Sequence, residues 1–178
     1  LFGREGRVIT AAAGQPVLER YHSDAAPSWV RHDHIGSVRS CDDSLGEHLQ
    51  RVLSTVNVAA IRKSRFRVLL DSNHGAGSLL GRKLLAELGC ETVLLGDTPD
   101  GQFEHTPEPT AENLSQVSQH VRDARVDVGF CQDPDADRLA IIDQGGIYVG
   151  EEYTLALAVR HILQQNPGPI VTNCSTSR

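Results

Sequence analysis

Only seven residues, 132–138, separate two apolar runs in the second half of this 178-residue chain. The runs are Val126–Cys131 and Leu139–Ile142, and each has the length of a buried β-strand. A parallel pair of neighbouring strands needs a crossover connection of about a dozen residues or more. If these two runs pair directly with each other, they must therefore run antiparallel.

Before that loop, short apolar runs alternate with helical patterns, which is typical of βαβ units. The expected elements are a helix over 44–65 capped by the box Ser44 and Glu47, a strand at Phe66–Asp71, a helix at Ser78–Leu88, a strand at Thr92–Gly96 and a helix over 110–124 capped by Thr110. Strands joined through helices should be parallel, with right-handed crossovers. We therefore expect an α/β fold, a three-layer α/β/α domain around a small mixed four-stranded sheet. Its first three strands are parallel and its fourth is antiparallel.

The two ends of the chain lie outside this pattern. In the first 34 residues only Val8–Thr10 suggests a strand. After a turn at 144–146, a strand at Ile147–Val149, a helix at Glu151–Gln164 and a strand at Pro169–Asn173 are expected. This last unit has too few strands to close its own sheet, so we interpret it as the start of a second, similar domain. The chain begins without Met, and we expect that it was cut from a longer one.

Composition narrows the class of protein. The formal net charge of −6 argues against a nucleic-acid partner, and no apolar run approaches the ~18 residues of a membrane span. No signal peptide is visible. The cysteines are far apart and show no C-x-x-C spacing, which favours reduced thiols in a cytoplasmic protein. They are Cys41, Cys90, Cys131 and Cys174.

The loop between the two apolar runs carries three alternating carboxylates, Asp133, Asp135 and Asp137, followed at once by Arg138. Fully extended, the outer two would lie roughly 13 Å apart, so the loop must curl if all three bind one ion. Oxygen ligands favour Mg²⁺, Mn²⁺ or Ca²⁺ over softer metals. The residues alone leave two interpretations open, a divalent-cation site and a solvated acidic turn. A phosphatase with an Asp nucleophile is a weaker third, because no matching Lys or downstream acidic pair follows.

A second loop, Ser72–Gly77, follows the first strand of the βαβ pattern and should open on the same edge of the sheet as the Asp loop. It lacks the Lys-Ser/Thr of a P-loop, so we expect a tight turn that lets the next helix begin close to the sheet. His74 has no identifiable partner in the sequence and receives no catalytic role. His32 and His34 are interpreted as solvated polar residues.

Several stretches together resemble one enzyme family. Asp133–Arg138 resembles the magnesium loop of the α-D-phosphohexomutases, whose common form is D-G-D-G-D-R, with Pro134 and Ala136 in place of the glycines. Leu70–Gly77 looks like the D-x-x-N-G-A-G stretch of that family's second domain, with one extra His. The resemblance covers roughly residues 35–178. Further matching stretches are 84–89, 99–101, Phe103, 107–110, 113–114 and 150–152.

The resemblance implies an isomerase that moves a phosphoryl group between the 1- and 6-positions of a hexose phosphate. In such enzymes a phosphoserine of the first domain donates the group, and a bisphosphorylated sugar reorients in the cleft. Carried over to this chain, Asp133, Asp135 and Asp137 hold Mg²⁺ and Arg138 contacts the reacting phosphate. The alternative from another class is a free-standing divalent-cation-binding module without catalysis.

The resemblance also divides the chain. Residues 1–34 would be the tail of a first domain and a linker, 35–145 a complete second domain, and 146–178 the start of a third. The family's serine loop, T-A-S-H-N-P or similar, is not found in the 178 residues. We therefore expect this chain to need the other domains of its parent, and to have no mutase turnover alone.

Overall fold

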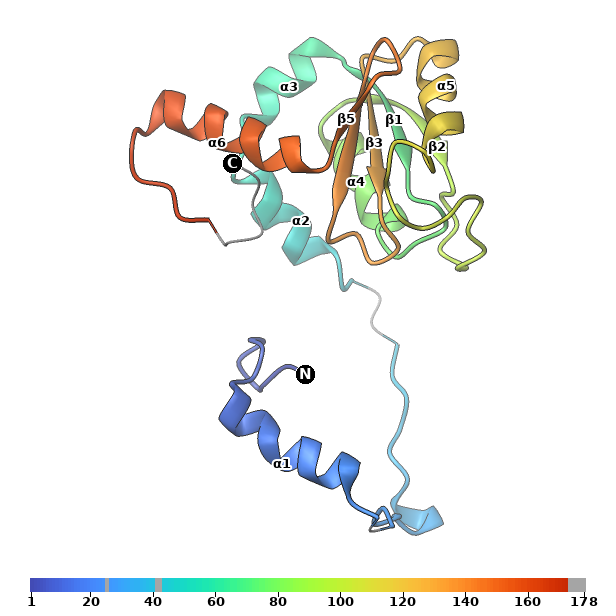
Figure 1. Cartoon of the computed structure of the whole chain (residues 1–178), viewed down its shortest axis with the longest axis vertical. Coiled ribbons are helices and arrows are strands. Elements are labelled where there is room, and N and C mark those ends of the chain that lie inside the picture. The colour runs from blue at the N-terminus through green and yellow to red at the C-terminus, as the bar shows by residue number, and fades with distance from the viewer. Residues whose placement is uncertain (25, 41–42, 173–178) are drawn as a thin grey trace. The chain divides into compact units, whose positions relative to one another are not determined.

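The computed structural model describes residues 1–24, 26–40 and 43–172, which divide into two compact units, 1–41 and 42–178 (Figure 1). The first unit contains helix α1 (Ala11–His22) and a short 3₁₀ helix, η1 (His32–His34). The Thr10 hydroxyl accepts a 3.2 Å hydrogen bond from the amide of Ala13 and caps α1. The predicted strand at Val8–Thr10 is wrong, because Val8 forms only an isolated bridge with Phe2 and Thr10 is the N-cap of α1.

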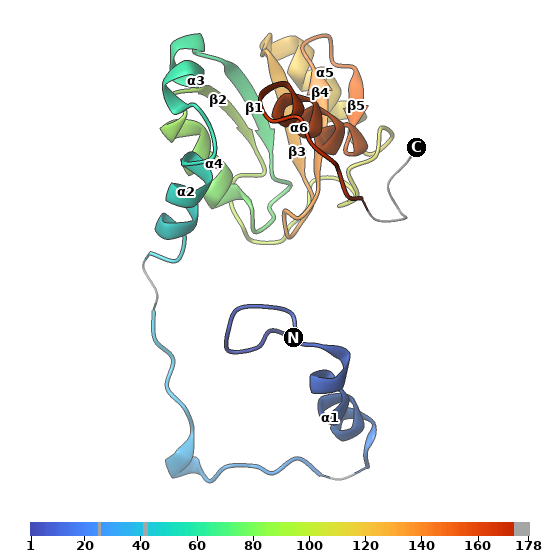
Figure 2. The same ribbon diagram turned by 90° about the vertical axis from the view of Figure 1, so that its left-hand side faces the viewer.

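The second unit is built on one mixed sheet in the order β2-β1-β3-β4-β5 (Figures 1 and 2). Strand β1 pairs parallel with both β2 and β3, and β3 pairs antiparallel with β4. The predicted directions of the first four strands are therefore confirmed. The strands are β1 (Arg67–Asp71), β2 (Glu91–Leu95), β3 (Val128–Gln132), β4 (Leu139–Asp143) and β5 (Tyr148–Gly150).

The sheet has five strands, so the predicted count of four is wrong. Strand β5 pairs antiparallel with β4, with Ile142 opposite Tyr148. The connection is tight because Oδ1 of Asp143 accepts hydrogen bonds from the amides of Gly145 and Ile147, both at 2.9 Å. Residues 148–150 thus extend the sheet of the second unit, while the domain boundary after residue 145 stays a prediction.

Helices cover both faces of the sheet, which confirms the three-layer α/β/α architecture (Figure 2). Alternate residues of β1 point to opposite faces. Val68 and Leu70 form one core cluster with Leu85 of α4 (Ser78–Glu87). Leu69 belongs to the other cluster, together with Val117 and Val121 of α5 (Ser115–Ala124) and Ile142 of β4.

The single helix expected over 44–65 is two helices, α2 (Gly46–Leu53) and α3 (Val58–Ser64). At the break, the hydroxyls of Ser54 and Thr55 donate 2.7 Å hydrogen bonds to carbonyls of the preceding turn, and Asn57 caps α3. The predicted capping box of Ser44 and Glu47 is wrong. The amide of Gly46 is bound by Asp43 instead, at 2.8 Å.

Two further boundaries differ from expectation. Helix α5 begins at Ser115, and Thr110 accepts a 3.4 Å hydrogen bond from Asn113 in the turn before it. Helix α6 (Glu152–Gln165) packs beside β4 and β5. No strand forms over 169–172, and residue 173 of that predicted strand lies outside the described residues. Among the described helices, none is long and apolar enough to cross a membrane.

Candidate metal centre

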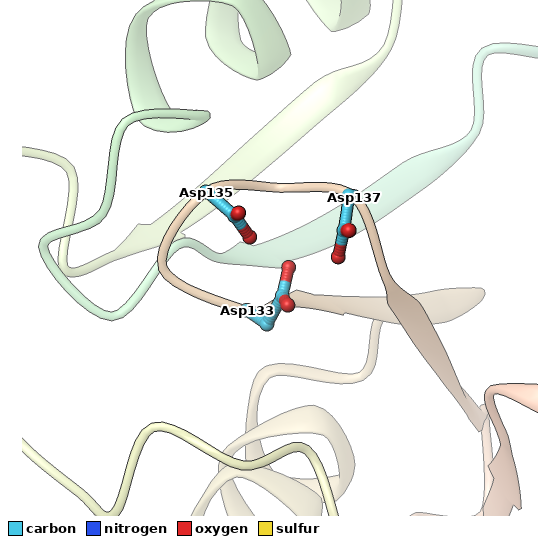
Figure 3. A group of neighbouring side chains, drawn as sticks. All are labelled: Asp133, Asp135 and Asp137. Carbon is cyan, nitrogen blue, oxygen red and sulfur yellow. The ribbon is translucent and has the colours of Figure 1, made fainter. Parts of the chain in front are cut away.

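The Asp loop leaves the carboxyl end of β3 and curls back into β4. The amide of Ala136 donates a 3.0 Å hydrogen bond to the carbonyl of Asp133, and Ala136 has a left-handed φ of 61°. This curl brings the three aspartates together, with one carboxylate oxygen of each within 4.8 Å of the others. Figure 3 shows their side chains directed toward one another inside the loop.

The three carboxylates differ in environment. Asp133 is buried, while Asp135 and Asp137 are exposed. Burial opposes ionisation of Asp133, but hydrogen bonds from the Arg138 amide (3.1 Å) and guanidinium (2.9 Å) outweigh it and lower the pKa of that carboxyl. The charge of Asp135, followed by a hydrogen bond with Asp133, raises the pKa of Asp137. The loop therefore holds carboxylates that repel one another.

This donor set fits a hard divalent cation. Mg²⁺ takes oxygen ligands at about 2.0–2.1 Å, so opposite ligands lie about 4 Å apart. Neighbouring ligands lie about 3 Å apart, and the three aspartate oxygens, within 4.8 Å of one another, are near this range. A cation would also remove the mutual repulsion that shifts the pKa of Asp137.

Arg138 lies beside the acidic cluster and binds two carboxylates. Its Nε donates to Asp133, and its Nη1 and Nη2 donate to the two carboxylate oxygens of Glu108, at 2.5 Å and 3.4 Å. These hydrogen bonds, first the one to Glu108 and then the one to Asp133, raise the pKa of the guanidinium. Glu108 falls in the family-like stretch 107–110, but the sequence analysis assigned it no role, because its partner Arg138 lies thirty residues later.

The loop at Ser72–Gly77 contacts the Asp loop, so the predicted common edge is confirmed. The amide of Ala76 donates a 2.8 Å hydrogen bond to the carbonyl of Pro134, and the hydroxyl of Ser72 donates one of 2.9 Å to the side chain of Gln132. Gly77 precedes the first residue of α4, Ser78. The amide of Gly75 donates a 2.7 Å hydrogen bond to the carbonyl of Ser72, which confirms the expected tight turn before that helix.

Contrary to the sequence analysis, His74 has several partners. Its Nδ1 lies 2.8 Å from the carbonyl oxygen of Thr98 and 3.2 Å from Asp100, and its Nε2 lies 3.3 Å from Glu104. The Thr98 carbonyl, then the Glu104 carboxylate, raises the pKa of His74. These partners all belong to the loop over 97–109, so His74 holds that loop to the sheet edge.

A second histidine, His105, belongs to the loop over 97–109 and contacts β1. Its Nε2 lies 2.8 Å from Oδ2 of the buried Asp71. The side-chain amide of Asn73 donates to the carbonyl of His105 at 3.0 Å and accepts from the amide of Glu104 at 2.9 Å. The loop that carries Glu108 is therefore fixed by β1 and the residues that follow it.

Fold and site together define an α/β/α domain with a loop of three converging aspartates at the carboxyl end of a central strand. A family model described as "Phosphoglucomutase/phosphomannomutase, alpha/beta/alpha domain II" matches residues 46–146. The chain therefore belongs to the phosphoglucomutase/phosphomannomutase family.

Curated relatives agree with this assignment. A phosphoglucomutase/phosphomannomutase of Thermococcus kodakarensis is 38% identical over 150 residues, which are 83% of this chain and 33% of that protein. A Methanopyrus kandleri protein named "Probable phosphoglucosamine mutase" is 33% identical over 153 residues, 85% of this chain and 32% of its own. The chain thus spans about a third of the length of these relatives.

Solved structures show the same fold. A crystal structure of a phosphoglucomutase/phosphomannomutase family protein from Burkholderia thailandensis matches with a TM-score of 0.54 and 30% identity, over 62% of this chain and 26% of that one. The phosphoglucomutase pp63/parafusin of Paramecium matches with a TM-score of 0.57 and 18% identity, over 66% of this chain and 23% of its own. This second likeness concerns the fold alone.

Proposed function

We propose that this chain supplies the metal-binding half of a phosphohexomutase active site. The observation that carries the proposal is the curled Asp loop, in which three carboxylates and Arg138 meet at the carboxyl edge of the sheet. Family membership supports an isomerase as the complete protein. The substrate class is a hexose phosphate, and the chain acts together with the other domains of its parent.

In this proposal Asp133, Asp135 and Asp137 hold Mg²⁺. The bound ion supplies charge stabilisation for phosphoryl transfer. The phosphoryl group leaves the oxygen of a phosphoserine for a sugar hydroxyl, which frees the serine hydroxyl. The other phosphoryl group of the resulting bisphosphate is then transferred to that hydroxyl. Arg138 donates hydrogen bonds to the oxygens of the transferred group. The aspartates hold Mg²⁺ beside that group.

The metal claim is tested by calorimetric titration of the chain with Mg²⁺. Asp135→Asn removes one charged ligand and should weaken binding by about tenfold or more, since even partners of metal ligands contribute 10–100-fold. Asp123→Asn, an exposed carboxylate on α5, changes the net charge equally and should leave the titration unchanged. Equal heats for the wild type and Asp135→Asn would contradict a metal site at the loop.

The expected lack of turnover and the enzyme class need separate experiments, an incubation for the first and the upstream reading frame for the second. The 178-residue chain is incubated with glucose 1-phosphate and Mg²⁺, and no glucose 6-phosphate is expected. Conversion by the purified chain would overturn the role assigned to a phosphoserine elsewhere. The reading frame upstream of Leu1 is expected to encode a serine loop of the T-A-S-H-N-P type, and its absence there would favour the free-standing module.

A further inference from the structure

Glu108 forms a bidentate ion pair with Arg138. Oε1 accepts from Nη1 at 2.5 Å and Oε2 from Nη2 at 3.4 Å. Exposed ion pairs are usually weak, and both side chains are partly exposed. A bidentate pair of guanidinium and carboxylate, however, fixes the orientation of the guanidinium as well as its distance.

The guanidinium is held at both ends. Of its five N–H groups, three donate hydrogen bonds: Nε to Asp133, and one each of Nη1 and Nη2 to Glu108. Two N–H groups on the Nη atoms are left for a ligand. The exposed carboxylate of Asp137 lies 3.8 Å from Nε, beyond hydrogen-bond distance.

Glu108 itself stands on a well-fixed segment of backbone. It is flanked by Pro107 and Pro109, whose φ angles are restricted. The side-chain amide of Asn113 donates to the carbonyl of Glu108 at 2.9 Å. The hydroxyl of Tyr148, on β5, donates to the carbonyl of the buried Pro109 at 2.7 Å. Glu108 is therefore placed by the fold rather than by chance surface pairing.

We propose that Glu108 is a positioning residue for Arg138. It keeps Nη1 and Nη2 on Glu108, so that Asp137 has only the 3.8 Å ion pair with Nε and stays available for a cation, while two Nη–H groups stay available for a phosphoryl oxygen. Without Glu108, the released Nη groups would turn to the nearest exposed carboxylate of the acidic cluster. The inference rests on the proposed function for the nature of the ligands, but the orientation of Arg138 can be measured without them.

The first test reads that orientation directly. Nitrogen-15 NMR of the guanidinium, assigned by its loss in Arg138→Lys, should show slow rotation about the Cζ–Nη bonds in the wild type. Rotation should become fast in Glu108→Ala, and remain slow in Glu112→Ala, a control that removes an exposed carboxylate four residues away. Fast rotation already present in the wild type would overturn the proposal.

The second test reads the consequence for the cation, with Mn²⁺ as the probe. Glu108→Gln, which keeps the size of the side chain, should weaken Mn²⁺ binding by about two- to fivefold, the scale of a partly exposed ion pair. The same substitution in an Arg138→Ala background should have a clearly smaller effect, since Glu108 acts through Arg138. An undiminished effect in that background would show a direct charge effect and would overturn the positioning role.

The two tests separate the inference from the proposed function. If the wild type does not bind Mn²⁺, the proposed metal site is disproved, while slow guanidinium rotation that depends on Glu108 still supports the positioning role of Glu108. If Mn²⁺ binds to the wild type but substitution of Glu108 changes neither rotation nor affinity, the positioning role of Glu108 is disproved and the proposed metal site is retained. Amide spectra of each variant confirm that the fold is retained.

Discussion

The backbone amide of Ala76 donates a 2.8 Å hydrogen bond to the carbonyl oxygen of Pro134, which joins the loop after β1 to the loop after β3. The two loops approach so closely that a side chain between them is not accommodated. A Cβ atom built at Gly75 would lie 2.6 Å from the Pro134 oxygen and 3.0 Å from the Ser72 oxygen. Both neighbours are backbone atoms, so neither can rotate away.

Gly75→Ala should therefore move the Asp loop. We expect a loss of about 1–3 kcal/mol in the free energy of unfolding, the usual cost of overpacking, together with weaker Mg²⁺ binding by calorimetry. Gly36→Ala is the matched control, since a Cβ there meets nothing within 4 Å and should leave both quantities nearly unchanged. Wild-type stability in Gly75→Ala would mean that the two loops are not held together as described.

Ala136 is the residue of the Asp loop with a left-handed backbone, at a φ of 61°. A residue with a Cβ is disfavoured there, and glycine is not. We predict that Ala136→Gly raises the free energy of unfolding by about 1 kcal/mol in urea denaturation. Ala86→Gly, on the exposed side of α4, should instead lower it by about 1 kcal/mol. A destabilised Ala136→Gly variant would show that the Ala136 side chain contributes packing that exceeds the backbone strain.

Much of the fold could be predicted because each β-strand or α-helix depends on local patterns. Strand β4 forms over Leu139–Asp143 as expected, and its direction follows from the short loop before it. Strand β5 could not be assigned to the sheet because its three residues carry too little alternation. Its position depends on the turn that Asp143 stabilises. The break between α2 and α3 was missed because the apolar spacing continues through Ser54 and Thr55, whose hydroxyls bond to the backbone.

The residues of the candidate site likewise fall into those that the sequence predicted and those that it did not. The three aspartates are neighbours in sequence, so their convergence could be anticipated from the need of the loop to curl. Glu108 and His105 reach the site across thirty residues or more, through the loop over 97–109. That loop has no periodic pattern, and its path is set by hydrogen bonds to Asn73 and His74. Only the tertiary structure brings such partners together.

Leu69 is fully buried in the core cluster on the α5 side of the sheet, whereas Leu79 of α4 is 39% exposed. Truncation of a buried leucine removes transfer free energy and leaves a cavity. Leu69→Ala should lower the free energy of unfolding by about 2–5 kcal/mol, and Leu79→Ala should cost well below that. Equal losses in urea denaturation would contradict the described burial of β1 between two helical layers.

The His105–Asp71 contact should make stability depend on pH. The 2.8 Å hydrogen bond to Asp71 raises the pKa of His105 against the effect of burial, with smaller contributions from the Thr106 carbonyl and the Glu104 charge. The folded pKa thus lies above the unfolded value of about 6.5. A group of this kind contributes its full stabilisation below the unfolded pKa and loses it as the pH rises through the folded one.

We therefore predict that the stability advantage of the wild type over His105→Gln is largest near pH 6 and shrinks as the pH rises above about 6.5. The pKa of His74 is also raised. Because His74 is present in both the wild type and His105→Gln, its contribution cancels in the comparison at each pH. In an Asp71→Asn background the partner charge is gone, so the pH dependence of the His105 effect should largely disappear. Urea denaturation across the pH range measures both differences, and an advantage that grows with pH would contradict the raised pKa of His105.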